Sequence, residues 1–184
     1  TGIQFSNRLV EGKSLLNQIL LNGSGVAAGD VDGDNLCDLY FCGLDSPNRL
    51  YRNLGDWRFE DITASSGAAC RGLDCTGTAL ADLDGDRDLD LLVNTLFRGT
   101  LCFRNEGEGI FTDVTKNSGI IPSRGAMTFA LADIDGDTLL DLYVVHYRAT
   151  ALMDMPNTDF NLQTVGGEKR VSHVNGRSVN SPEF

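Results

Sequence analysis

The segment ADLDGDRDLDLLVN, residues 81–94, alternates aspartate with other residues and then continues into an apolar run. Its five aspartates are Asp82, Asp84, Asp86, Asp88 and Asp90. Two carboxylates about 4 Å apart repel each other by roughly 1 kcal/mol in water and by about 4 kcal/mol at an effective dielectric constant of about 20. A loop that gathers so many carboxylates is therefore unfavourable unless a cation lies among them.

The acidic loop is part of an internal repeat. Related segments are AGDVDGDNLCDLYFCG at 28–43 and ADIDGDTLLDLYVVHY at 132–147. The first aspartates of the three loops are 52 and 51 residues apart: Asp30, Asp82 and Asp133. A second block, YRNLGDWRFEDIT at 51–63, aligns with FRNEGEGIFTDVT at 103–115 at the same offset of 52. Two independent blocks with one period indicate a structural repeat of about fifty residues.

Each repeat reads as short strands separated by turns. In the second unit the expected strands are Thr76–Leu80, Leu89–Thr95, Thr100–Asn105 and Ile110–Thr115. Strands joined by hairpin-length loops form one antiparallel sheet, and no window has the periodicity of an amphipathic helix. The small residues of Gly25–Ala28 and Gly77–Ala81 suit an innermost strand where sheets converge. We predict an all-β chain of four-stranded antiparallel β-propeller blades, about three of them, in an incomplete propeller. Tandem β-sandwich modules are the alternative, but these are usually nearer about 100 residues each.

The three loops share one ligand pattern, counted from the first aspartate. Aspartate occupies positions 1, 3, 5 and 9, and glycine always occupies position 4. Calcium takes roughly six to eight oxygen ligands and tolerates irregular geometry. We therefore predict one calcium ion per loop, held by those carboxylates and by the backbone carbonyl of position 7. The predicted ligands are Asp30, Asp32, Asp34, Leu36 and Asp38; Asp82, Asp84, Asp86, Asp88 and Asp90; and Asp133, Asp135, Asp137, Leu139 and Asp141.

Other interpretations of the loops fit less well. Aspartate and glycine also form simple turns, but three loops with the same spacing disfavour that explanation. Magnesium prefers a few carboxylates plus waters in strict octahedral geometry. An EF-hand needs a bidentate glutamate at position 12, where this chain has Phe41, Val93 and Val144, and a β-rich run follows instead of a helix. A calcium loop ahead of a strand is expected to act as a rigid staple between strands.

The motifs DVDGDNLCDLYF, DLDGDRDLDLLV and DIDGDTLLDLYV resemble the FG-GAP/VCBS repeat of integrin-α-like propellers. The block NRLYRNLGDWRFEDIT, followed by Ser-Gly, resembles the bacterial group whose proteins end in an ASPIC/UnbV domain. This resemblance covers roughly residues 1–148. It implies calcium loops between the first and second strands of each blade, in an exported protein that is extracellular, at the cell surface or periplasmic. Position 6 is often glycine in such repeats, but here it is Asn35, Arg87 and Thr138, of which Asn best tolerates a left-handed backbone.

The C-terminal part differs from the repeats. The third unit has no LYRN block after its second expected strand, and residues 149–184 are polar and rich in turns. We interpret 149–184 as an insertion on the third blade or the start of a further segment, incomplete here, with short strands at Phe160–Val165 and Arg170–Val174. The chain is thus expected to be an N-terminal fragment of a longer protein that supplies the remaining blades.

Charge and motifs restrict the function. The net charge is −11, with 26 acidic and 15 basic residues, which argues against nucleic acid or an anionic membrane as partner. No apolar run approaches the ~20 residues of a membrane helix, and no nucleophile elbow, phosphate-binding glycine loop or zinc pattern is present. We expect a non-enzymatic, calcium-binding scaffold for a protein or polysaccharide ligand. The alternative is the propeller scaffold of a carbohydrate-active enzyme whose catalytic residues lie outside this chain.

The cysteines leave two possibilities open. The chain contains Cys37, Cys42, Cys70, Cys75 and Cys102. They are either buried thiols or form one or two disulfides in an exported protein, with one thiol left over. Cys70 and Cys75 flank a short loop, RGLD, that a disulfide could close.

Overall fold

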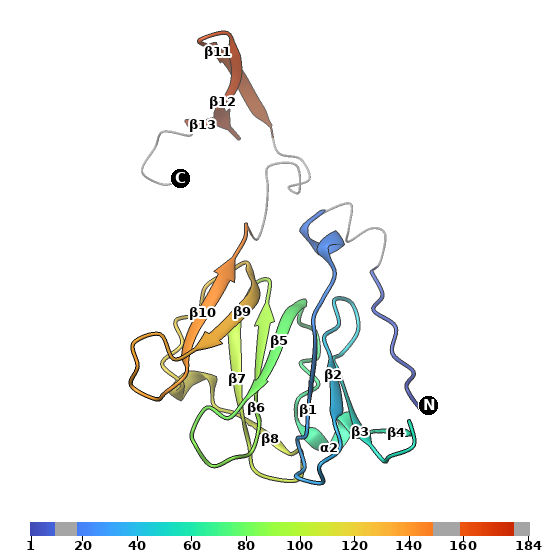
Figure 1. Ribbon diagram of the computed structural model, residues 1–184. Helices are drawn as coiled ribbons and strands as arrows, with labels where there is room; N and C mark the ends of the chain where they lie inside the picture. The colour runs from blue at the N-terminus through green and yellow to red at the C-terminus, as the bar shows by residue number, and fades with distance from the viewer. Residues whose placement is uncertain (10–17, 149–158, 179–184) are drawn as a thin grey trace.

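The computed structural model describes residues 1–9, 18–148 and 159–178, and these form an all-β fold of four antiparallel sheets (Figure 1). Two sheets have four strands, one has three and one has two. Among the described residues, no helix combines the length and the apolar character needed to cross a membrane.

The first three sheets have the order expected of propeller blades. The first contains β1 (Val26–Gly29), β2 (Asp38–Phe41), β3 (Arg49–Asn53) and β4 (Phe59–Asp61). The second contains β5 (Cys75–Ala81), β6 (Asp90–Thr95), β7 (Gly99–Asn105) and β8 (Phe111–Asp113). The third, as far as the structure describes it, pairs β9 (Ala126–Ala132) with β10 (Asp141–His146). Each strand pairs with its neighbour in the chain, so the predicted four-stranded blade is confirmed.

Short helical turns follow the fourth strands, where the sequence suggested only a break. These are the one-turn helix α2 (Thr63–Ser66) and the 3-10 turn η2 (Thr115–Asn117); a further 3-10 turn, η1 (Gln18–Asn22), precedes β1. Asp61 Oδ1 accepts a hydrogen bond from Thr63 N at 3.0 Å, and Asp113 Oδ1 accepts one from Thr115 N at 2.9 Å. These aspartates therefore stabilise turns.

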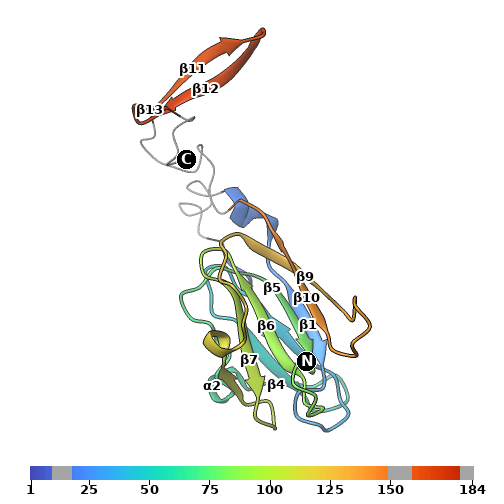
Figure 2. The ribbon, with the colours of Figure 1, turned by 90° about the vertical axis from the view of Figure 1, so that its left-hand side faces the viewer.

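The blades lie side by side and meet along their first strands (Figures 1 and 2). Strand β1 contacts β5, and β5 contacts β9. A Cβ atom at Gly25 would lie 2.9 Å from Gly77 Cα, and one at Gly77 would lie 2.3 Å from the Met127 carbonyl oxygen. Only glycine fits such close approaches of two backbones, which explains the small residues of the innermost strands.

The core lies between the first two blades. One cluster of buried residues draws on both sheets and includes Val31, Tyr40, Leu50, Leu91 and Phe103. Strand β6 is buried at every position because neighbouring sheets cover both of its faces. This arrangement holds the start of β6, where the second acidic loop ends, in a rigid environment.

The fourth sheet is a separate antiparallel unit. It contains β11 (Phe160–Val165), β12 (Glu168–Val174) and the short β13 (Arg177–Ser178). Both strands predicted in this region are confirmed, with β12 beginning two residues earlier than expected. The interpretation of 149–184 as an insertion stays a prediction, since residues 149–158 and 179–184 lie outside the described part of the chain.

Candidate metal centres

Each acidic loop connects the first and second strands of its sheet. Loop 1 (30–38) follows β1, loop 2 (82–90) follows β5 and loop 3 (133–141) follows β9. In every case the first aspartate comes directly after a strand, and the position-9 aspartate is the first residue of the next strand. Figure 1 shows the three loops along one edge of the blades.

The position-1 aspartate folds the loop around its own carboxylate. In loop 1, Asp30 Oδ1 accepts a hydrogen bond from Gly33 N at 2.8 Å, and Oδ2 accepts one from Asn35 N at 2.8 Å. Asp82 and Asp133 accept bonds from positions 4 and 6 of their loops in the same way, at 2.7–3.0 Å. The local sequence therefore builds the same turn three times.

This turn requires left-handed backbone at positions 4 and 6. The position-4 glycines have φ of +80°, +85° and +80°: Gly33, Gly85 and Gly136. At position 6, Asn35 has φ 64°, Arg87 has φ 82° and Thr138 has φ 74°. The two loops with Arg and Thr adopt the conformation that the sequence identified as least suited to those residues.

The position-9 aspartate closes each loop. Asp38 Oδ2 accepts a hydrogen bond from Val31 N at 2.9 Å, and its Oδ1 accepts one from Asn53 N in β3 at 2.8 Å. Asp90 is bound in the same manner by Leu83 N and Asn105 N, both at 2.9 Å. Asp38 and Asp90 are buried, whereas Asp141 is exposed and accepts from Ile134 N at 2.9 Å.

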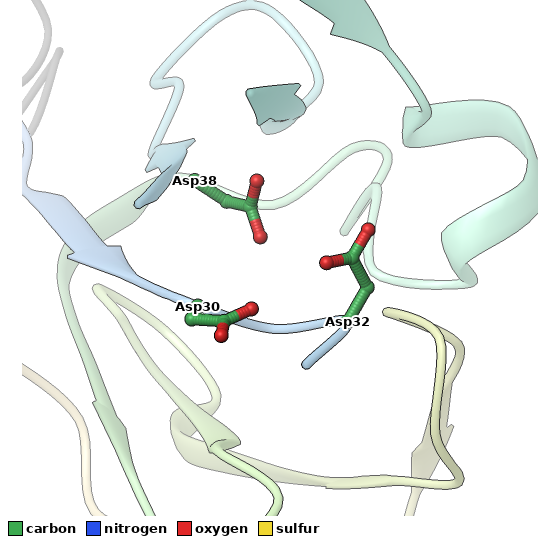
Figure 3. Close-up of side chains that lie close together, drawn as sticks. All are labelled: Asp30, Asp32 and Asp38. Atoms are coloured by element: carbon green, nitrogen blue, oxygen red, sulfur yellow. The ribbon is translucent and has the colours of Figure 1, made fainter. Parts of the chain in front are cut away.

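Three carboxylates gather in every loop, with one oxygen of each within 4.8 Å of the others. Figure 3 shows the group of loop 1, in which Asp30, Asp32 and Asp38 face a common space. The complete groups are Asp30, Asp32 and Asp38; Asp82, Asp84 and Asp86; and Asp133, Asp135 and Asp141. Positions 1 and 3 occur in all of them, and such an oxygen set matches the preference of a hard divalent cation.

Some predicted ligands lie outside these groups. Asp34 Oδ1 accepts a hydrogen bond from Leu36 N, and Asp137 Oδ1 accepts one from Leu139 N, both at 2.8 Å. Asp90 is held by its two backbone donors. The side chain of Asp88 is exposed. Ligation by these residues, and by the carbonyl groups of Leu36, Asp88 and Leu139, stays a prediction.

The electrostatics of the buried carboxylates favour a cation. Burial raises the pKa of Asp38, and the nearby charges of Asp32 and Asp34 raise it further, although two backbone hydrogen bonds oppose the shift. The pKa of Asp90 is raised for the same reasons, with Asp84 and Asp86 as the neighbouring charges. A bound cation would remove this repulsion and favour the ionised carboxylates.

Two residues of the second repeat block contact the acidic loops without belonging to them. The ligand pattern of the loops did not predict these contacts. Asn105 donates from Nδ2 to Val31 O of loop 1 at 2.9 Å and to Leu89 O of loop 2 at 3.1 Å. Arg52 forms an ion pair with Asp32, in which Nε lies 2.7 Å from Asp32 Oδ2 without a well-directed hydrogen bond. A terminal nitrogen of Arg52 donates a hydrogen bond to Glu108 O at 3.3 Å. Their recurrence at the offset of 52, as Asn53 with Asn105 and Arg52 with Arg104, was the available signal.

Comparison with known proteins agrees with this architecture. Residues 30–93, from the start of loop 1 into β6, match the FG-GAP-like repeat family. Over this segment the chain is similar to an FG-GAP-like repeat. It is also similar to cartilage acidic protein 1 from Homo sapiens, with 29% identity over 134 residues, covering 70% of this chain and 20% of that protein. The similarity to cartilage acidic protein 1 from Xenopus tropicalis is 30% over 124 residues, covering 66% of this chain and 19% of that protein. The chain thus spans about one fifth of the length of these relatives.

Proposed function

We propose that this FG-GAP-like, β-propeller-type module binds calcium through its three acidic loops. The observation that carries the proposal is the threefold recurrence of three carboxylate oxygens within 4.8 Å of one another, always between the first and second strands of a sheet. The hydrogen bonds that the position-1 and position-9 aspartates accept organise the backbone of each loop around these oxygens. An oxygen site whose backbone is held by its own hydrogen bonds loses little conformational entropy when it binds an ion.

Each type of loop residue has its own task in this proposal. Positions 1 and 3 present oxygens, and the position-9 carboxylate fixes the start of the second strand. When bound, calcium supplies the positive charge that offsets the repulsion around Asp38 and Asp90. The bound loop then holds the first and second strands of the blade together, which makes the ion a structural staple.

We further propose that the module is a binding or adhesion scaffold of an exported protein, with a protein or polysaccharide as ligand. The match to a repeat family and the similarity to proteins named for cartilage support this class and an extracellular location. Membership of the bacterial ASPIC/UnbV group stays a proposal based on the sequence motifs alone. An array of glycans and peptides, probed with and without calcium, tests for the ligand.

The metal proposal is tested by titration calorimetry of chelator-stripped protein with calcium and, separately, with magnesium. We expect saturable calcium binding and a calcium-dependent rise in Tm, because a ligand that binds the folded state alone stabilises it. Asp84→Asn should weaken binding at loop 2. Asp56→Asn is the matched control, since the Asp56 side chain is 93% exposed and lies outside the loops. Absence of binding at millimolar calcium, or equal losses in both variants, would refute the proposal.

A further inference from the structure

Three cysteines and a tyrosine meet at the junction between the first two blades. Cys42 directly follows β2, Cys70 lies in the segment after α2, and Cys75 begins β5. Cys42 and Cys75 are 0% exposed and belong to the same buried cluster as Tyr40, against which the partly exposed Cys70 packs. The structure describes all three cysteines as free thiols.

The chain turns sharply between Cys70 and Cys75, and the turn brings their side chains together. Leu73 N donates to Cys70 O at 3.3 Å, and Cys75 N is held by Gly43 O at 3.1 Å. Cys70 itself has φ +44°, a left-handed conformation that is uncommon for a residue with a side chain. Cys70 packs against the buried cluster that contains Cys75, and the Tyr40 hydroxyl oxygen lies 3.8 Å from Cys70 Sγ.

We propose that Cys70 and Cys75 form a disulfide that closes the RGLD loop and fixes the connection between the first and second blades. The turn and the shared cluster place the two side chains on the same side of this junction, where a bond between them closes a loop of four residues. The bond restrains the point where the chain passes from α2 into the innermost strand β5, which no metal loop secures. The disulfide forms and persists in an oxidising compartment.

The two thiols differ in a way that sets the order of reaction. The hydrogen bond from the Cys75 thiol lowers the pKa of Cys70, whereas the same contact and burial raise the pKa of Cys75. The partly exposed Cys70 thiolate attacks one sulfur of a low-molecular-weight disulfide such as oxidised glutathione, and one glutathione thiolate leaves. Cys75 then loses its proton and attacks Cys70 Sγ, which releases the second glutathione. Two protein thiols and one small disulfide thus become one protein disulfide and two small thiols.

Cys42 is the competing partner, but its geometry is different. Its Sγ lies 3.6 Å from Gly77 O, to which it donates, and burial raises its pKa. A cysteine-bound metal is the other competing explanation. Within the described residues, however, the only groups of three or more potential metal ligands are the aspartate groups of the acidic loops.

Tryptic peptides give a direct test, because Arg71 lies between the two cysteines. The chain is equilibrated in buffers of oxidised and reduced glutathione, acid-quenched, alkylated under denaturing conditions, digested and analysed by mass spectrometry. We expect peptides 59–71 and 72–87, each with one cysteine, to be joined with the loss of two hydrogens. Cys37, Cys42 and Cys102 should be alkylated.

Two outcomes would overturn the disulfide. One is that peptides 59–71 and 72–87 remain separate and alkylated at every glutathione ratio. The other is that either peptide is linked to peptide 14–49, which contains Cys37 and Cys42. Cys70→Ser should abolish the joined peptide and lower the Tm of the oxidised protein, whereas Cys102→Ser should leave the joined peptide in place. Peptide linkage is read in calcium-free protein, so this test is independent of the metal proposal.

Discussion

Substitution of Asn105 by Ala separates the two acidic loops that this side chain connects. Asn105 is 2% exposed, and its amide group makes three hydrogen bonds, to Val31 O, to Leu89 O and from Gly107 N. Its own backbone N–H still reaches Asp90 in the variant. The substitution therefore removes the link between the loops and leaves the closure of loop 2 intact.

The expected loss of stability follows from the burial of the three partners. A buried polar group left without a partner costs about 1–3 kcal/mol. Val31 is 2% exposed, so its carbonyl bears most of this penalty, whereas Leu89 and Gly107 are partly exposed and water replaces part of their loss. We expect the free energy of unfolding to fall by about 2–4 kcal/mol.

Asn53→Ala is the matched control, because Asn53 occupies the same repeat position in the first blade. Its side chain donates to Cys37 O at 3.0 Å and accepts from Gly55 N at 2.9 Å, and it is half-buried. We expect a loss of about 1 kcal/mol. Urea denaturation followed by circular dichroism measures both variants without calcium. A loss in Asn105→Ala no larger than that in Asn53→Ala would refute the reasoning.

Three further perturbations address the loops and the blade contacts. Thr138→Gly should stabilise the protein by about 1 kcal/mol and strengthen calcium binding at loop 3, because a left-handed backbone costs a residue with a side chain about 1–2 kcal/mol. Calorimetry measures the Tm and the calcium affinity, and an unchanged Tm would contradict this expectation. The raised pKa of Asp38 and Asp90 gives the calcium-free protein stability that is present below their ordinary value of 3.8 and is lost as pH rises through the folded-state values. The gain in Tm on adding calcium should therefore be larger at pH 7 than at about pH 4, and an equal gain at both would contradict the assignment. Gly77→Ala should destabilise by about 1–3 kcal/mol, because its Cβ would lie 2.3 Å from a backbone carbonyl oxygen of β9. Gly29→Ala meets only the side chains of Leu89 and Leu80 and should cost less in urea denaturation.

Local pattern was sufficient to predict the blade. The segment Thr76–Leu80 was expected as a strand and forms most of β5, and the acidic loop after it lies where the motif placed it. Both features depend on contacts within one repeat, such as the bonds from Asp82 to its own loop. A spacing pattern records such contacts because the residues involved are close in sequence.

Contacts between repeats could not be predicted in the same way. The sequence aligned Asn53 with Asn105, but it did not show that Asn105 reaches Val31, 74 residues earlier in the chain. The burial of Asp90 also depends on the third strand of its own sheet, because Asn105 N donates to it, whereas the described part of the third sheet has only β9 and β10 beside the exposed Asp141. Equal motifs thus acquire unequal environments through packing.

The charged residues around the loops indicate that loops 1 and 2 differ in their attraction for a cation. In loop 1, Arg52 places a positive charge 2.7 Å from Asp32 and so offsets part of the charge that an ion would neutralise. The matching Arg104 pairs with Glu106 at 2.6 Å instead, and among the described residues no basic side chain forms an ion pair with the carboxylates of loop 2. Loop 2 also carries the additional acid Asp88. Charge therefore favours loop 2, even though Asn35 gives loop 1 the less strained backbone at position 6.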